Sequence, residues 1–296
     1  MSSLHIPSRQ HYAILSSEAV HVPEGLPQRF RSSLRNAFLS TLAPLLRASF
    51  KPSLSCLYCH YVFDDQVREF EQLLKTLQSL ATFVDSDTCF ALLAGRKLLD
   101  RHYLHLSFDD GFKNLLSNAA PVLARLGIPG TAFVPTAILD ADYDTVARYC
   151  LQITRYAAPI EMLSWSDVRE LSSMGFAIGS HTRSHARLSE LSTEEQFREE
   201  IMFSKTDIEQ KLGMECPYIA WPYGTRGDTS TRSLEYIQQC GYSACFGAFR
   251  GRVLPGITNR YAIPRHHFEA DWPLNHVTYF LARNSRESTI TYENCK

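Results

Sequence analysis

The spacing of apolar residues changes along the chain at about residue 55. Beyond that point, short apolar runs typical of strands alternate with longer stretches whose apolar residues recur every three or four positions, as on one face of a helix. The runs predict strands over 54–62, 103–108, 130–135, 176–179, 218–221, 243–246 and 261–264. The longer stretches predict helices over 67–80, 115–126, 164–174, 193–212 and 230–240. This alternation is typical of parallel strands covered by helices and predicts an α/β sheet or barrel.

The N-terminal part of the chain follows another pattern. Apolar residues recur every four positions from Leu26 to Leu46, which predicts a helix with one apolar face. No acidic residue occurs between Glu24 and Asp64, whereas several arginines do, so this helix is basic. Two interpretations of residues 25–51 stay open: a helix packed on the main domain, or a helix lying on an anionic membrane surface.

These patterns divide the chain into a basic amphipathic extension (1–54), a main domain (55–275) and a C-terminal tail (276–296). Of the 296 residues, 45% are hydrophobic, so the chain can bury a core and is not a disordered protein. The 30 basic and 31 acidic side chains nearly cancel, which gives no reason to expect nucleic acid as a partner. No apolar run approaches the roughly 18 residues that a membrane-spanning helix needs.

The N-terminus lacks the charged start and apolar stretch of a secretory signal, so we expect a cytoplasmic protein, on the inner membrane face if residues 25–51 bind lipid. In that compartment the eight cysteines are expected to be reduced thiols. Cys56 and Cys59 match half of a redox or zinc motif. They lie in a predicted strand with no second CxxC, and we interpret them as two structural cysteines.

Two adjacent carboxylates, Asp109 and Asp110, follow the predicted strand 103–108 and precede Gly111. The carboxyl ends of strands face the mouth of an α/β fold, where ligand sites collect. A cation would relieve the repulsion between the two carboxylates. The alternative is an ordinary Asp-Asp-Gly turn without chemistry.

Two histidines, His181 and His185, are four residues apart. If the segment is helical, this spacing puts both imidazoles on one face, where they can converge on one ion, whereas the alternative is a pair of solvated or capping side chains. One carboxylate with two imidazoles suits Zn²⁺ or another divalent first-row ion such as Co²⁺ or Ni²⁺. The second carboxylate is then free to act as a general base, and the residues alone leave open which of Asp109 and Asp110 binds the ion.

The segments around these residues resemble one family. SFDDG (107–111) is similar to the first motif of the polysaccharide deacetylases, the NodB-homology domain of carbohydrate esterase family four. SHTRSH (180–185) matches the histidine motif of that family, and WPYG (221–224) resembles its aromatic-Pro-Tyr loop. The longer stretch GFAIGSHTRSHARLSEL (175–191) and CGYSAC (240–245) also resemble family segments.

The resemblance covers roughly residues 55–270 and implies a distorted (β/α) barrel of about seven strands. It also implies a metal-dependent hydrolase that removes N-acetyl groups from an amino sugar in a glycan or glycoconjugate and releases acetate. Asp110, His181 and His185 would hold the metal, and Asp109 would be the base for a water activated by it.

The resemblance assigns further roles around the implied site. Tyr223 would offer its backbone N–H to the oxyanion, and its ring would line the substrate cleft with Trp221 and Pro222. Arg265 resembles a position near the catalytic aspartate and would keep Asp109 ionised. The arginine that usually precedes the proline is absent, since Ala220 and Trp221 occupy that place.

A C-terminal Leu-x-His motif, whose histidine is the general acid in many relatives, has no clear counterpart here. Instead, residues 57–62 resemble the Tyr-x-His-x-Val strand of a subgroup with permuted strand order. His60 would then be the general acid, with His267, which would also line the cleft, as the competing candidate.

The same metal chemistry serves other acyl bonds. An O-acetyl ester, a formamide or a cyclic amide is therefore an alternative substrate, and a non-catalytic glycan-binding domain is a third hypothesis. The presence of all four of Asp109, Asp110, His181 and His185 favours an enzyme over a binding domain.

Overall fold

The computed structural model describes residues 16–20 and 52–284. The helix predicted within residues 25–51 and most of the predicted C-terminal tail lie outside these ranges. The division into three parts therefore stays a prediction, although helix α11 (Leu274–Asn284) continues across the boundary placed after residue 275. Within the described residues, no helix has the length and apolar character needed to cross a membrane.

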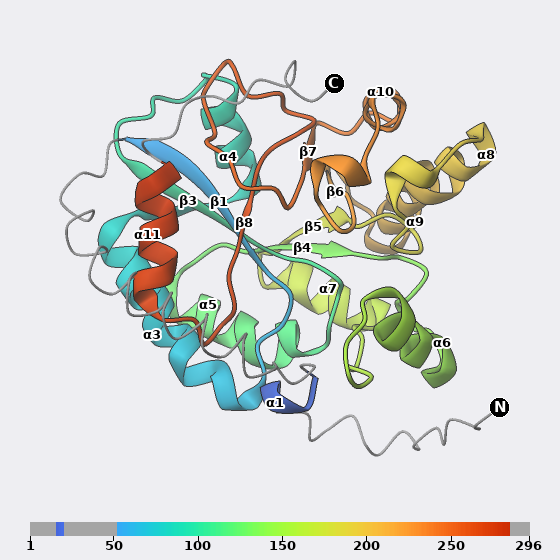
Figure 1. Cartoon of the computed structure of the whole chain (residues 1–296), viewed down its shortest axis with the longest axis horizontal. Helices are drawn as coiled ribbons and strands as arrows, with labels where there is room; N and C mark the ends of the chain where they lie inside the picture. Colours follow the sequence, from blue (N-terminus) through green and yellow to red (C-terminus); the bar gives the residue numbers. More distant parts are fainter. Residues whose placement is uncertain (1–15, 21–51, 285–296) are drawn as a thin grey trace, which may run out of the picture.

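The centre of the fold is one curled sheet in which all paired strands are parallel. Seven strands follow the order β7-β6-β5-β4-β3-β1-β8, and β2 pairs with β3 beside this path. The strands are β1 (Ser53–Cys59), β2 (Thr82–Val84), β3 (His102–Phe108), β4 (Thr131–Val134), β5 (Ala177–Ser180), β6 (Tyr218–Ala220), β7 (Ala244–Phe246) and β8 (His266–His267). The expected distorted α/β barrel of about seven strands is confirmed (Figure 1).

Helices follow most of the strands. The α-helices besides α11 are α1 (Ser17–Val20), α3 (Val67–Leu80), α4 (Ser86–Leu93), α5 (Ala120–Leu126), α6 (Tyr143–Arg148), α7 (Trp165–Ser173), α8 (Glu194–Phe197), α9 (Phe203–Leu212) and α10 (Thr231–Gln239). Three π-helical turns (Leu115–Ala119, Tyr149–Ile153, Arg198–Met202) and three 3-10 turns (Asp64–Gln66, Leu188–Glu190, Arg226–Asp228) complete the set. The helices predicted over 115–126 and 193–212 therefore each contain a π turn.

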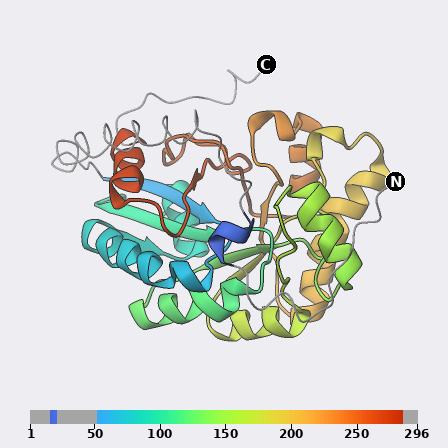
Figure 2. The same cartoon turned by 60° about the horizontal axis from the view of Figure 1, so that its bottom comes forward.

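The side chains of each strand alternate between the two faces of the sheet, and both faces are buried. Every residue of β1 and β3 is buried, because helices cover one face and the barrel interior covers the other. Leu57 and Leu104 belong to the outer cluster with α3 and α5, whereas Leu54, Cys56 and Tyr103 belong to the inner cluster. Helix α4 packs on this inner side, opposite to α3. Figure 2 shows α3, α5 and α7 side by side around the outside of the sheet.

The prediction of a strand at 261–264 is wrong. Ile263 forms only an isolated bridge to Phe246, and the strand that follows, β8, pairs with β1 instead. Pro264 cannot donate a backbone hydrogen bond, so a regular strand cannot continue through it. This segment thus passes from the edge of β7 to the edge of β1, and its next residue, Arg265, lies fully buried.

Candidate active site

The carboxyl ends of β1, β3 and β5 meet at one mouth of the barrel. A cavity of about 390 Å³ lies there. Its walls include both aspartates that follow β3, both histidines of the segment after β5 and the histidine that follows β1: Asp109, Asp110, His181, His185 and His60. The fold thus gathers residues that are far apart in sequence at the place where α/β folds carry their sites.

Asp110, His181 and His185 form a buried group, named here the mouth site. The Nε2 atoms of His181 and His185 lie 3.4 and 3.2 Å from Asp110 Oδ1. The three side chains are at most 5% exposed, and their ligand atoms all lie within 4.8 Å of one another. These residues can therefore hold a metal ion.

The hydrogen bonds around the mouth site suit a metal ion. His181 Nδ1 lies 2.8 Å from the carbonyl oxygen of Ala220, so Nδ1 carries the proton and Nε2 presents its lone pair to the site. Among the described residues, no well-aligned hydrogen bond reaches the buried Asp110 Oδ1. Burial disfavours a charged His181, but Asp109 and Asp110 outweigh burial and raise the pKa of His181. The site therefore concentrates negative charge and attracts a cation.

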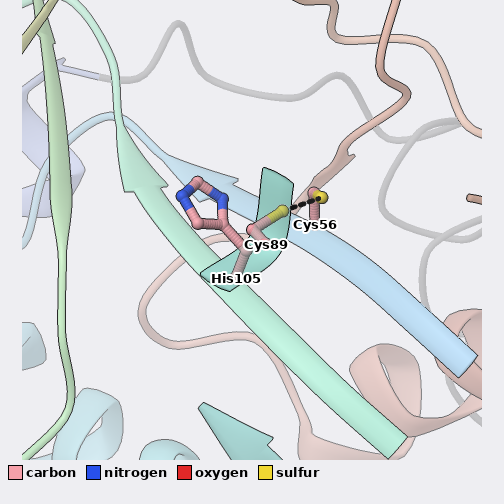
Figure 3. Close-up of side chains that lie close together, drawn as sticks. All are labelled: Cys56, Cys89 and His105. Atoms are coloured by element: carbon pink, nitrogen blue, oxygen red, sulfur yellow. Dashed lines mark hydrogen bonds between the residues drawn. The ribbon is translucent and has the colours of Figure 1, made fainter. Parts of the chain in front are cut away.

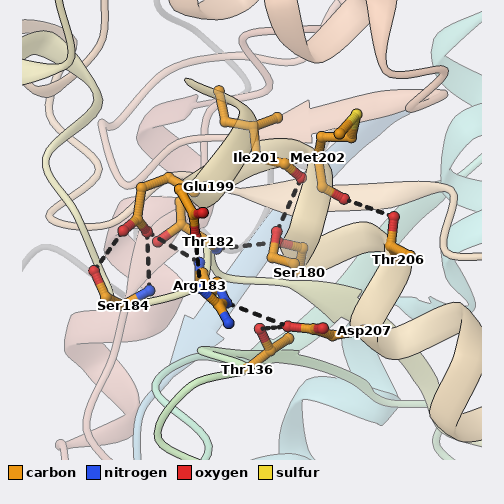
Figure 4. A network of polar contacts seen from close by, with 12 residues as sticks. Thr136, Ser180, Thr182, Arg183, Ser184, Glu199, Ile201, Met202, Thr206 and Asp207 are labelled. Atoms are coloured by element: carbon orange, nitrogen blue, oxygen red, sulfur yellow. Dashed lines mark hydrogen bonds and ion pairs between the residues drawn. The ribbon is translucent and has the colours of Figure 1, made fainter. Parts of the chain in front are cut away.

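A hydrogen-bonded network holds the histidine loop in place (Figure 4). The Glu200 carboxylate accepts from the backbone N–H groups of Arg183 and Ser184 at 3.1 and 2.9 Å. Ser180 Oγ accepts from the Thr182 N–H at 3.0 Å and lies 2.7 Å from Ser204 Oγ. The π turn at 198–202 and helix α9 thereby fix the loop between the two histidines from behind.

Left-handed backbone conformations concentrate around the cavity. Six non-glycine residues among the described ones have positive φ, and four of them line the cavity: Asp110, Arg155, His185 and Tyr223. A fifth, Thr182, lies between the two histidines with φ of 62°. Such conformations cost free energy and persist where the surroundings enforce them, which is typical of functional sites.

Arg265 forms a bidentate pair with Asp109. Its Nη1 and Nη2 atoms donate to Asp109 Oδ1 and Oδ2 at 2.7 and 2.6 Å. Two further N–H donors reach Ser107 Oγ at 2.9 Å and the Gly247 carbonyl oxygen at 2.8 Å. Burial alone would favour a neutral Asp109, but the charge and hydrogen bonds of Arg265, together with the nearby imidazoles of His181 and His60, outweigh burial and lower the pKa of Asp109. Asp109 is therefore a fixed, ionised carboxylate beside the mouth site.

The two histidines proposed as general acid occupy different positions. His60 lines the cavity, whereas His267 is not among the described residues that line it, and the two ring centroids lie 5.1 Å apart. His267 packs at 5.1 Å from the Tyr58 ring, and its Nε2 lies 3.3 Å from Glu269 Oε1. Desolvation lowers the pKa of His267 to about 3, so this side chain is neutral near pH 7.

The predicted aromatic loop forms another wall of the cavity. Tyr223 is 39% exposed, with its ring centroid 4.9 Å from that of His185. Trp221 is buried, contacts the cavity and donates its Nε1–H to the Thr225 carbonyl oxygen at 3.1 Å. Pro222 is also buried, and it is not among the described residues that line the cavity.

Sequence reasoning missed other parts of this wall. The guanidinium of Arg187 lies 3.9 Å from the centroid of the Tyr223 ring and pairs with Asp228. Residues 152–156 supply a second wall, and Tyr149 meets the His185 ring edge-on at 5.6 Å. Arg187 follows the histidine motif by two residues, which is a weak signal, whereas the segment after α6 carries no recognisable pattern.

Comparisons with known proteins agree with this geometry. The sequence profile of the family "Polysaccharide deacetylase" matches residues 97–245. The chain is 23% identical over 170 residues to the "Putative polysaccharide deacetylase YxkH" of Bacillus subtilis. The aligned region covers 57% of this chain and 54% of that protein. The chain thus spans about half the length of this curated relative.

Solved structures share the fold. IcaB from Ammonifex degensii matches with a TM-score of 0.65 at 22% identity, over 79% of this chain and 98% of that one. A de-N-acetylase from Aggregatibacter actinomycetemcomitans matches with a TM-score of 0.62 at 17% identity, over 77% and 99% of the two chains. PplD of Streptococcus pyogenes, solved in complex with acetate, gives 0.61 at 17% identity, over 79% and 99%. Since the family profile matches half of the 296 residues, the chain belongs to the polysaccharide deacetylase family.

Proposed function

We propose that the protein is a metal-dependent N-deacetylase that releases acetate from an N-acetylated amino sugar in a glycan or glycoconjugate. The observation that carries this proposal is the ionised Asp109, held by Arg265, beside the mouth site in an open cavity. One carboxylate and two imidazoles suit Zn²⁺, Co²⁺ or Ni²⁺. Such an ion, when bound, polarises a carbonyl group and lowers the pKa of water.

Asp109 is the general base in this proposal. Each of its carboxylate oxygens accepts one hydrogen bond from Arg265 and keeps a second acceptor position for the attacking water. Arg265 acts as a positioning residue, because it fixes the plane of the carboxylate and keeps it ionised. The neighbouring side chains of the mouth site then place the substrate carbonyl within reach of that water.

His60 is the proposed general acid, which protonates the departing amine nitrogen. It lines the cavity, whereas His267 is not among the described residues that line it and is neutral near pH 7. The position of β1 between β3 and β8 brings this N-terminal histidine to the mouth. This arrangement supports the assignment to the subgroup with a permuted N-terminal strand.

The wall opposite His60 is proposed to hold the sugar. Tyr223 offers its backbone N–H to the oxyanion and its ring to the substrate, and Trp221 lines the cavity beneath it. The family arginine is absent from this loop. Arg187, stacked on Tyr223, is the cation that the structure places on the same wall, and we assign it the role of contacting the substrate there.

Acetate release tests the proposal. The metal-loaded protein is incubated with free, nucleotide-linked, lipid-linked and polymeric N-acetyl sugars, together with O-acetyl esters and N-formyl compounds. We expect acetate and a new amine from at least one N-acetyl sugar, and at least about 100-fold slower release from Asp109→Asn. Turnover of esters or formamides alone would favour another acyl substrate. Metal binding and glycan binding without any turnover would favour a glycan-binding domain.

A further inference from the structure

Three side chains of the kinds that bind metal ions lie close together on the strands and a helix (Figure 3), and none of them lines the cavity at the mouth. Cys56 of β1, Cys89 of α4 and His105 of β3 are each 0% exposed, and their ligand atoms all lie within 4.8 Å of one another. His105 lies on β3 four residues before Asp109, which directly follows that strand, and this places the group about 13 Å deeper than the mouth. We name these three residues the inner site.

The hydroxyl groups around His105 leave one of its ring nitrogens available to bind a metal ion. Its Nε2 lies 2.9 Å from Ser86 Oγ and 3.0 Å from Thr131 Oγ1. A proton on Nε2 is therefore shared with these hydroxyls, which leaves the lone pair on Nδ1. Nδ1 is buried and has no hydrogen-bond partner among the described residues. Metal-bound histidines typically show this arrangement, with the distal ring nitrogen hydrogen-bonded and the other facing the ion.

The two sulfur atoms have the separation that a shared ion requires. Cys56 Sγ and Cys89 Sγ are 3.8 Å apart. Two thiolates bound at about 2.3 Å to a tetrahedral zinc ion also lie about 3.8 Å apart. In a disulfide the two sulfurs would be only about 2.05 Å apart. The observed separation thus fits an ion between the thiols without any movement of β1 or α4.

The charges also balance. Cysteine binds a metal ion as the thiolate, so both thiols lose their protons when an ion binds. A divalent ion with two thiolates and a neutral imidazole carries no net charge, which removes the main cost of burying an ion in the barrel. Sulfur ligands select zinc-like or softer ions over magnesium and calcium.

The CxxC spacing does not create this group. Cys56 and Cys59 are three residues apart on β1, so their side chains lie on opposite faces of the sheet. Cys59 belongs to the outer cluster, and its Sγ donates to the Tyr61 carbonyl oxygen at 3.1 Å. The partner of Cys56 is instead Cys89, from a helix that the sequence pattern did not predict.

We propose that Cys56, Cys89 and His105 bind a structural metal ion, with Zn²⁺ as the expected occupant, independently of the mouth site. The ion would join β1, α4 and β3 where β3 changes partners: residues 103–105 pair with β2, and residues 107–108 pair with β4. Since β1 and β3 are already paired at this point, with Cys56 opposite His105, the ion would chiefly tie α4 to the sheet. These side chains would supply three of the four ligands of a tetrahedral structural ion.

Metal content and cobalt spectra test this proposal. The wild-type chain is expected to hold about two zinc ions, and His181→Ala/His185→Ala about one. Adding Cys56→Ala to that variant should remove the remaining ion. Adding Cys245→Ala, which alters a buried cysteine of β7, should not. In the cobalt-substituted histidine variant we expect a thiolate-to-cobalt charge-transfer band in the near ultraviolet, and its loss in Cys89→Ala.

Three results would overturn the proposal. One is a wild-type protein that binds a single ion and shows no thiolate-to-cobalt band when two equivalents are offered. Another is a band that survives the loss of Cys56 or Cys89. The third is a thiol count on the unfolded wild type that shows Cys56 and Cys89 joined as a disulfide. Because the wild-type spectrum needs no variant to fold, it decides the question even if the cysteine variants are unstable.

Discussion

Strand β3 contributes to both the mouth site and the inner site, and the two differ in every other respect. The mouth site has oxygen and nitrogen ligands, lies on loops with left-handed backbone and faces a cavity. The inner site offers two sulfur ligands and one nitrogen, lies on two strands and a helix, and is fully buried. An ion that must meet substrate needs an open position, whereas an ion that stabilises a fold needs a closed one. The same barrel can thus meet both requirements, with the open site at its mouth and the closed site deeper inside.

The variant with the largest expected effect disrupts only the mouth site. His181→Ala removes a ligand whose lone pair is aimed by the Ala220 carbonyl group, so the ion is lost. We expect acetate release to fall by more than about 1000-fold, beyond the cost of losing one oxyanion-hole donor. Metal analysis and acetate assays check this, with His185→Ala as the matched variant. Near wild-type turnover in either variant would contradict the metal assignment.

The two sites also differ in how far sequence reveals them. Asp109, Asp110, His181 and His185 fall in two short segments at strand ends, so local spacing was enough to group them. The ligands of the inner site come from positions 56, 89 and 105 on three elements. Their grouping depends on tertiary packing, in particular on the placement of α4, whose 8 residues show no clear amphipathic pattern.

The fold shows the same division. Long periodic segments were predicted well, and the helix predicted over 67–80 matches α3 from end to end. Short elements were missed, among them β2, α4 and α6, because a few residues carry too little periodicity to identify an element. The barrel closure at 261–267 could not be inferred, since it depends on which strand edges remain free after the sheet has curled.

The next prediction separates ligand from base at the mouth. Asp109→Asn keeps the shape of the side chain but removes its ability to take a proton. We expect metal content to remain and kcat to fall by about 10²- to 10⁴-fold, the usual contribution of a general base. Metal analysis and acetate release on the same preparation check both halves. Loss of the ion would show that Asp109, rather than Asp110 alone, is a ligand.

The next prediction concerns stability instead of rate, and it tests the buried pair of Arg265 and Asp109. Arg265→Met leaves Asp109 as an unpaired buried charge, and removing one partner of such a pair costs about 3–5 kcal/mol of unfolding free energy. Urea denaturation of wild type, Arg265→Met, Asp109→Asn and the double variant checks this. We expect the double variant to recover part of the loss. Equal stability of Arg265→Met and wild type would mean that the pair is not needed to balance the buried carboxylate.

A smaller effect distinguishes His60, which lines the cavity, from His267. His60→Asn should lower kcat by about 100-fold, because it removes the proposed proton donor to the amine. His267→Asn should lower it by less than about tenfold, since His267 contacts Tyr58, His60 and Glu269 and does not line the cavity. Substrates with a better leaving group should partly rescue His60→Asn and not His267→Asn. The reverse pattern would assign the acid role to His267.

The smallest effect concerns the hydroxyls that orient the inner site. Thr131→Val keeps the side-chain shape but removes one of the two hydroxyls near His105 Nε2, while Ser86 Oγ remains. Loss of one buried hydrogen bond costs about 1 kcal/mol, so we expect a slightly lower unfolding free energy, weaker retention of the thiolate-bound ion and unchanged acetate release. Ser204→Ala is the matched control for the loss of one buried hydroxyl. It removes the hydroxyl that lies 2.7 Å from Ser180 Oγ, behind the mouth site and away from the inner site. If Thr131→Val instead lowered acetate release as strongly as Asp109→Asn does, the two sites would be coupled, and their separation by depth would not hold.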